Sequence, residues 1–151
     1  MKYYEINDDT IAVIPIGFEK TKIVEKNNEY IINARAYSIM DESCKYYGST
    51  YKGRLNAAKK ILQCSYKLPI LVEESQNLIF FPTKSSLEED CCWINFNYIE
   101  KIDKTENGSV IFFTNQKDII IPVSKLSLEN QISRSIRLSY IISERKKKFQ
   151  I

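Results

Sequence analysis

Hydrophobic and polar residues alternate over short stretches along much of the chain, a pattern typical of β-strands that bury one face. The turn-forming pairs Asp8-Asp9 and Asn27-Asn28 separate the first of these stretches. Strands are predicted at residues 3–6, 10–16, 21–25, 30–32, 70–73, 78–81 and 92–102. Residues 78–81 are continuously apolar, which favours a buried strand over the alternative of an exposed dimer edge.

Two further turn signals follow in the last third of the chain. Asn107-Gly108 is a strong signal for a tight hairpin turn, here leading into a strand at residues 110–113. Asn115-Gln116 marks a second turn before residues 119–121. This region is therefore expected to form an antiparallel meander.

Helical composition appears between the two strand-rich regions. Residues 34–44 are expected to form a short helix, and residues 55–63 place three apolar side chains on one side of a second helical segment. Residues 45–54, between them, combine bases, two glycines and three tyrosines, which predicts a loop. No segment here resembles a helix-turn-helix with its recognition helix.

A final helix is predicted to begin near Ser127, whose hydroxyl can cap it, with Glu129 favourably placed in the first turn. Its apolar side is expected to hold Leu128, Ile132, Ile136 and Ile142. Nearly opposite, within an arc of about 80°, lie the bases Arg134, Arg137, Arg145 and Lys148. The helix is therefore expected to pack with one face and to present a basic stripe with the other.

Together these elements predict an α+β fold in a single domain, residues 1–151. It consists mostly of antiparallel β-strands with a short central helix and a C-terminal amphipathic helix. A chain of 151 residues with 44% hydrophobic and 27% charged residues can bury one sizeable core. No apolar run approaches the roughly 18 residues of a membrane span, and the N-terminus has no hydrophobic signal core. We therefore expect a soluble, cytoplasmic protein.

The composition also excludes several kinds of chemistry. Histidine is absent, which removes Ser-His-Asp and Cys-His catalysis and histidine metal sites. The four cysteines form no Cys-x-x-Cys pair, which favours reduced thiols over a zinc site or a disulfide framework. No glycine-rich phosphate-binding motif occurs. We therefore expect no enzyme, no metal and no cofactor.

The net charge of +3 conceals a strong polarity along the chain. Residues 43–72 contain six bases and no acid, and residues 130–151 contain six bases and one acid, which gives +6 and +5. The remainder must carry 3 − 11 = −8. Such a chain can build a positive face on an acidic body, and nucleic-acid phosphates bind such faces.

A family resemblance begins in the first basic segment, where residues 43–54 have the sequence SCKYYGSTYKGR. Motifs in the same order follow: KLPILV at 67–72, LIFFPTKSS at 78–86, CWI at 92–94, FTN at 113–115, PVS at 122–124 and SLENQ at 127–131. In these motifs, which span roughly residues 9–138, the chain resembles the ComK family of bacterial competence transcription factors.

The resemblance implies a transcription activator of DNA-uptake genes that binds paired A/T-rich boxes, chiefly through the minor groove. It implies several partners: A/T-rich double-stranded promoter DNA, further copies of the chain as a homo-dimer or higher oligomer, RNA polymerase and a Clp-protease adaptor. The expected location is the bacterial cytoplasm, at the nucleoid. The two basic segments agree with binding to A/T-rich DNA, since narrow A/T minor grooves attract inserted Arg and Lys.

The chain departs from the family pattern in two places. Family members usually carry a longer C-terminal tail tied to adaptor recognition, whereas this sequence stops at Ile151. Degradation control and full activation through such a tail are therefore not carried over. Gln116 stands where the family tends to have Gly, and because Gln tolerates positive φ less well, that turn is expected to use another geometry.

The expected DNA contacts are Lys45, Tyr51, Lys52, Arg54, Asn56, Lys59, Lys60, Arg134 and Arg137. Lys52 and Arg54 flank Gly53 in the predicted loop, where glycine permits close approach, and are expected to enter the groove. Phosphate contact is expected of Lys45, Lys59 and Lys60, and non-specific attraction or a subunit contact of the C-terminal helix.

For the remaining polar and aromatic residues of interest, the sequence leaves two possible roles open. Asn56 either recognises a minor-groove edge or serves the start of its helix. Tyr46, Tyr47 and Tyr51 either wedge at base steps or pack into the core, with core packing expected for at least two of them. Trp93 is expected in the core, with a subunit contact as the alternative.

A competing function class is a non-catalytic interaction module that docks acidic partners through the same basic face. Binding to an A/T-rich duplex, compared with heparin and a scrambled G/C duplex, separates this class from a DNA-binding regulator.

Overall fold

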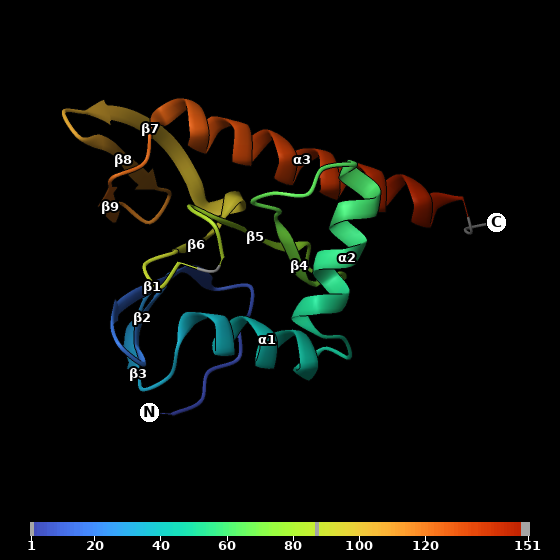
Figure 1. Ribbon diagram of the computed structural model, residues 1–151, viewed down its shortest axis with the longest axis horizontal. Coiled ribbons are helices and arrows are strands. Elements are labelled where there is room, and N and C mark those ends of the chain that lie inside the picture. Colours follow the sequence, from blue (N-terminus) through green and yellow to red (C-terminus); the bar gives the residue numbers. More distant parts are fainter. Residues whose placement is uncertain (1, 87, 149–151) are drawn as a thin grey trace.

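The computed structural model describes residues 2–86 and 88–148, and it folds as two antiparallel sheets with three α-helices (Figure 1). The strands are β1 (Thr10–Gly17), β2 (Lys20–Glu25), β3 (Glu29–Ile32), β4 (Ile70–Glu73), β5 (Leu78–Pro82), β6 (Trp93–Asn95), β7 (Ile99–Thr105), β8 (Gly108–Phe113) and β9 (Asp118–Ile121). The helices are α1 (Ala36–Tyr46), α2 (Tyr51–Leu62) and α3 (Lys125–Lys147), with a short 3-10 turn, η1, at Phe96–Tyr98. The predicted α+β class is confirmed.

The larger sheet has the strand order β3-β2-β1-β6-β5-β4. One of its faces packs against α1 and the start of α2, with Val13, Ile23, Phe80 and Trp93 buried beneath the helices. These residues come from four different strands, so helix packing ties together both halves of the sheet. The expectation that Trp93 lies in the core is confirmed, because its side chain is 2% exposed.

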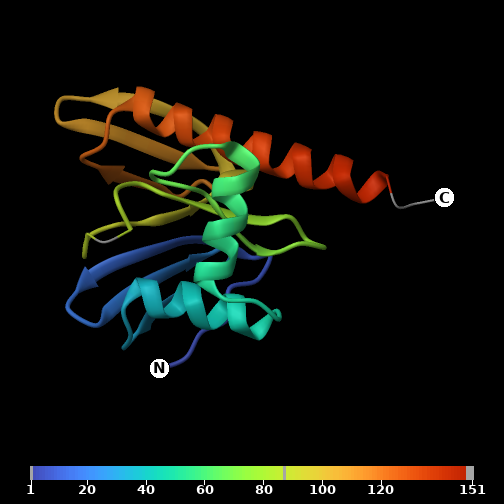
Figure 2. The same cartoon turned by 45° about the vertical axis from the view of Figure 1, so that its right-hand side comes forward.

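The smaller sheet, β7-β8-β9, covers part of the opposite face of the larger sheet. Ile94 and Phe81 of the larger sheet share a cluster with Ile111 and Phe113 of the smaller one and with Leu128 of α3. A third cluster joins Ala58 and Leu62 of α2 to Ile79 of β5 and Leu138 of α3. The long helix α3 therefore contacts both sheets and α2 (Figure 2).

Most predicted strands and the meander are confirmed, but two strand predictions were wrong. Residues 3–6 form no strand, because Ile6 donates its backbone N–H to Ser43 Oγ at 3.0 Å and its carbonyl accepts from the Tyr47 hydroxyl at 2.8 Å. Residues 92–102 are not continuous, because the Asn95 side chain accepts from the Asn97 backbone N–H at 3.0 Å and starts η1.

Both meander turns differ from the expected geometry. The first turn uses Glu106-Asn107, and Gly108 is already the first residue of β8. A Cβ at Gly108 would lie 2.2 Å from the Ile121 carbonyl oxygen, so this glycine permits close packing of β8 against the end of β9. The expectation of a different geometry at Gln116 was wrong: it adopts a φ of 71°, and the turn is supported by Asn115 Oδ1, which accepts from the Lys117 N–H at 3.1 Å.

The last helix begins at Lys125 rather than near Ser127. Ser124 is its N-cap, and the Ser124 hydroxyl oxygen accepts from the Ser127 N–H at 3.1 Å. The predicted apolar side was wrong at Ile136, which is 53% exposed. The buried side instead holds Leu128, Gln131, Ser135 and Leu138.

Gln131 explains why the helix turns this side inward. Its side-chain amide donates to the Pro82 carbonyl at 2.7 Å and so ties α3 to the end of β5. The small Ser135, whose hydroxyl donates to the Gln131 carbonyl, lies one turn further along the same side. Within residues 2–86 and 88–148, no helix combines the length and apolar character that crossing a membrane requires.

Candidate nucleic-acid interface

The segment expected to be a loop at residues 45–54 is mostly helical, and the prediction was wrong there. α1 continues to Tyr46 and α2 begins at Tyr51, so four residues join them, with Gly48 at a φ of 91°. Figures 1 and 2 show α2 running across the direction of α1. Two helices joined in this way by a short, glycine-containing turn have the general form of a helix-turn-helix, which the sequence pattern did not reveal.

The start of α2 is fixed by two hydrogen bonds. Thr50 Oγ1 accepts from the Gly53 N–H, and Asp41 Oδ1 of α1 accepts from the Tyr51 N–H, each at 2.9 Å. A Cβ at Gly53 would lie 3.1 Å from Thr50 Oγ1, so a glycine leaves room for this cap. Capping of this kind satisfies N–H groups that the helix itself cannot pair.

The outer face of α2 consists of Lys52, Asn56, Lys59, Lys60 and Gln63, all of which are exposed. At about 100° per residue, Lys52, Asn56, Lys59 and Gln63 fall on one stripe and Lys60 lies beside it. Among the described residues, none forms an ion pair with these three lysines. This face therefore offers three free cations and two amides to a partner.

Gln63 was missed by the sequence analysis. It is the C-cap of α2, in the left-handed conformation with a φ of 54°. The signal that would have found it is its spacing of four residues from Lys59, which places both on one helix face.

Arg54 lies on the other side of α2 from Lys52, because residues two apart on a helix point about 160° away from each other. It is half-buried and lines a cavity of about 170 Å³ with Leu71 of the β4 strand and Leu138 and Ile142 of α3. Its Nε is buried with no hydrogen-bond partner among the described residues. The structure therefore separates the two residues expected to enter a groove together.

The three tyrosines of this segment take different places. Tyr51 is 4% exposed and packs edge-on against Trp93, with ring centroids 5.8 Å apart, so it is absent from the outer face of α2. Tyr47 is half-buried and bonded to the Ile6 carbonyl. Tyr46 is 67% exposed. Core packing of at least two of them, as expected, is confirmed.

Lys45 is exposed near the end of α1 and pairs with two acids of its own helix. Its Nζ lies 3.1 Å from Asp41 Oδ2 and 3.5 Å from Glu42 Oε1. The Tyr51 backbone hydrogen bond, and then Lys45, hold the pKa of Asp41 below its usual range. Lys45 therefore has part of its charge compensated locally, unlike the lysines of α2.

In the predicted basic stripe of α3, too, one base is bonded within the protein and another is exposed. Arg134 is half-buried, and its Nη1 donates to the Tyr66 carbonyl at 2.8 Å and to the Lys67 carbonyl at 3.3 Å. Arg137 is exposed, and no described residue forms an ion pair with it. Arg134 therefore holds the segment after α2 against α3, and Arg137 is left available to a partner.

The acidic and thiol groups of the described chain show no metal-binding arrangement. Within residues 2–86 and 88–148, no group of three or more Cys, Asp or Glu side chains is placed to hold a metal ion. Burial raises the pKa of the Cys44, Cys91 and Cys92 thiols to about 11, which keeps them protonated at neutral pH.

Comparison with known proteins gives a consistent result. The family model described as "ComK protein" matches residues 1–147. The chain is 34% identical over 139 residues to the competence transcription factor of Bacillus subtilis (strain 168), an alignment that covers 89% of this chain and 72% of that protein. No solved structure matches.

Proposed function

Because the chain belongs to the ComK family, we propose that it is a transcription regulator of competence genes that binds A/T-rich double-stranded DNA. The observation that carries the DNA-binding part is the outer face of α2. Free lysines on an exposed helix can neutralise phosphates, and the amides of Asn56 and Gln63 on the same face can hydrogen-bond to base edges.

The proposed contact with the minor groove follows from the family resemblance. An α-helix is about 10–12 Å wide, whereas the minor groove of B-DNA is about 6 Å wide. In this mode α2 therefore lies across the groove, and the long side chains of Lys52 and Lys59 reach into it between the phosphate rows.

A second mode is favoured by the arrangement of α1 and α2. A helix carried on a short turn from a preceding helix suits insertion into the major groove, which is about 12 Å wide and admits a helix. In this mode Asn56 and Gln63 contact base edges directly, and the lysines contact the flanking phosphates.

Fluorescence anisotropy with a duplex containing A/T boxes tests the interface. The change Lys52→Ala/Lys59→Ala is expected to weaken binding by at least tenfold, because two unpaired phosphate-binding charges are lost. Lys20→Ala/Lys104→Ala, which removes two exposed lysines from β2 and β7, is the matched control and is expected to bind normally. Unchanged binding by the double variant contradicts the proposal.

A minor-groove ligand and a major-groove modification of the DNA show which groove the protein contacts. Distamycin, which fills A/T minor grooves, is expected to compete if α2 lies across the minor groove, whereas methylation in the major groove leaves binding unchanged. The opposite result assigns α2 to the major groove. Equal binding to heparin, to a scrambled G/C duplex and to the A/T duplex indicates instead a module that docks acidic partners through this face.

The remaining partners implied by the family are part of the same proposal. Further copies of the chain assemble on the promoter, RNA polymerase contacts the regulator there, and a Clp-protease adaptor is a partner away from the promoter. Footprinting on A/T-rich promoter DNA, with the number of bound protomers measured alongside, tests the assembly of further copies. One protomer bound per pair of A/T boxes contradicts assembly.

A further inference from the structure

A second surface feature lies away from α2, at the edge formed by the β1–β2 hairpin, the start of α1 and the β5–β6 loop. It is a cavity of about 450 Å³. Its aromatic residues are Phe18 at 69% exposure, Tyr37 at 47% and the buried Trp93. The Arg35 guanidinium already lies over the Phe18 ring, 4.7 Å from its centroid. Phe18 thus already binds a cation of its own chain, and Tyr37 is the exposed aromatic ring of this cavity that is left for a further cationic side chain.

Acidic residues surround the same cavity. Glu19, Glu88, Glu89 and Asp90 line it, and all four are exposed. Asp90 pairs with Lys84, but among the described residues no ion pair involves Glu19, Glu88 or Glu89. The cavity thus has a negative rim that is only partly compensated within the molecule.

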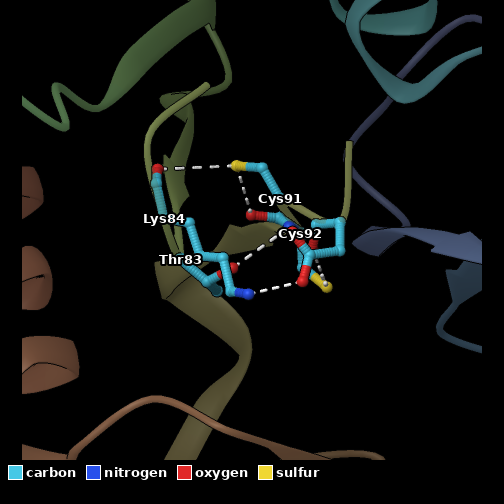
Figure 3. Close-up of polar contacts among 5 residues, drawn as sticks. Thr83, Lys84, Cys91 and Cys92 are labelled. Carbon is cyan, nitrogen blue, oxygen red and sulfur yellow. Dashed lines mark hydrogen bonds and ion pairs between the residues drawn. The ribbon is translucent and has the colours of Figure 1, made fainter. Parts of the chain in front are cut away.

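The loop that carries most of this rim is held by short-range hydrogen bonds (Figure 3). The Thr83 N–H donates to the Cys92 carbonyl at 2.9 Å, and the Cys92 N–H donates to Thr83 Oγ1 at 3.0 Å. The Cys91 thiol contacts the Lys84 carbonyl at 3.6 Å. The two ends of the loop are therefore pinned together, and the Cys91 N–H also donates to the carbonyl of the rim residue Glu88 at 3.2 Å.

The opposite end of the molecule has the complementary charge. The end of α3 extends past the rest of the fold (Figures 1 and 2). It carries four exposed bases in a row, Arg145, Lys146, Lys147 and Lys148. Lys146 and Lys147 have acidic neighbours in Glu74 and Glu144, whereas no described residue pairs with Arg145 or Lys148.

We propose that the basic end of α3 in one copy docks into the acidic, aromatic cavity of a second copy. In Figure 2 the β1–β2 hairpin and the β5–β6 loop lie on the left and the end of α3 on the right, so a copy cannot fill its own cavity. In this contact the unpaired carboxylates of Glu19, Glu88 and Glu89 face the unpaired bases Arg145 and Lys148, and an inserted cation lies beside the half-exposed Tyr37 ring. The contact is head-to-tail, so each copy keeps one free end and the assembly can grow.

Sedimentation velocity of the full chain without DNA tests this contact independently of the proposed function. The wild type is expected to self-associate at low salt and to dissociate at high salt, because the contact is largely electrostatic. Glu88→Lys/Glu89→Lys in the rim and Arg145→Ala/Lys148→Ala in the helix end are each expected to weaken association by about tenfold or more. Glu100→Lys/Glu106→Lys, which makes the same charge change on the smaller sheet, is the matched control.

Mixing the two deficient variants gives the decisive result. The rim variant keeps an intact helix end, and the helix-end variant keeps an intact cavity, so a one-to-one mixture is expected to form dimers and no larger species. A wild type that stays monomeric at low salt overturns the proposal. So does a mixture that fails to associate, or association that survives in both variants.

Discussion

Cys44, Cys91 and Cys92 lie in the interior, and Cys64 is half-exposed just after α2. Burial raises the pKa of the three interior thiols to about 11, so almost no thiolate forms at neutral pH. Because the thiolate is the reactive species, burial and protonation both lower the reactivity of these three cysteines.

A thiol titration at neutral pH is therefore expected to show one rapidly reacting cysteine in the native protein and four after unfolding. Cys64→Ser is expected to remove the rapid phase, and Cys44→Ser to leave it unchanged. Two or more rapid thiols in the native wild type would contradict the burial of the other three.

Asp41 connects the two central helices through its hydrogen bond to the Tyr51 N–H. Asp41→Ala is expected to lower the free energy of unfolding by about 1 kcal/mol, the usual effect of losing a helix cap. Glu42→Ala, on the same helix and also beside Lys45, is the control and is expected to change stability little.

The pH dependence of this difference follows from the lowered pKa of Asp41. A carboxyl with a lowered pKa stabilises the fold above its ordinary pKa, and that contribution is lost as the pH falls through the lowered value. The difference in unfolding free energy between wild type and Asp41→Ala is expected to be full at neutral pH and to shrink in acid. A difference that grows in acid would show that the carboxylate is not the stabilising form.

Individual residues were predictable where their own neighbours in sequence decide their environment. The apolar run of β5 and the surrounding turns marked a buried strand, and that prediction is confirmed. Arg54 and Arg134 were not predictable, because each is half-buried by contacts from distant parts of the chain: Leu138 lies beside Arg54, and the Tyr66 carbonyl binds Arg134. A basic side chain has the same appearance in sequence whether it faces solvent or the body of the protein.

At the scale of elements, local signals located the helices but not their ends. Two glycines within ten residues indicated a loop, yet Gly53 lies inside α2 because Thr50 caps that helix. Ser124 and Ser127 are both good caps by type, and the sequence did not distinguish them. In the structure the Ser124 hydroxyl caps the helix, and the Gln131 hydrogen bond to the distant Pro82 carbonyl fixes which face of α3 is buried.

The division of the α3 bases leads to a prediction for this element. Arg134→Ala is expected to lower the free energy of unfolding by about 1.5 kcal/mol, because it removes charged hydrogen bonds to two backbone carbonyls. Arg137→Ala, three residues away and exposed, is expected to leave stability unchanged. Urea denaturation of both variants measures the difference, and equal stabilities would show that the Arg134 contacts are weak.

At the scale of the whole molecule, the order of strands in the larger sheet was beyond sequence patterns. β1 pairs with β6 through Ala12 and Ile94, which lie far apart along the chain. β6 has three residues, and its alternation carries no information on which strand it will join. The antiparallel meander was predictable because consecutive strands joined by tight turns pair with each other.

The unpaired lysines of α2 predict how DNA binding by the whole molecule depends on salt. If the three unpaired lysines of α2 contact phosphates, the logarithm of the DNA-binding constant is expected to fall with the logarithm of salt concentration with a slope of about −3 per protomer. Lys52→Ala/Lys59→Ala is expected to reduce that slope by about two units. Anisotropy titrations across a range of KCl concentrations measure both slopes, and a slope near zero for the wild type would remove the electrostatic basis of the interface.

The position of α3 in the chain also affects how the protein is made. Leu128 completes the cluster between the two sheets, and Leu138 completes the one beside α2, yet both residues are synthesised after every strand. A nascent chain leaving the ribosome therefore exposes Phe81 and Ile79 of β5 until the last helix has emerged from the exit tunnel. The fold closes after translation of its core strands has ended, and during that interval we expect the growing chain to bind the chaperones that shield apolar surface.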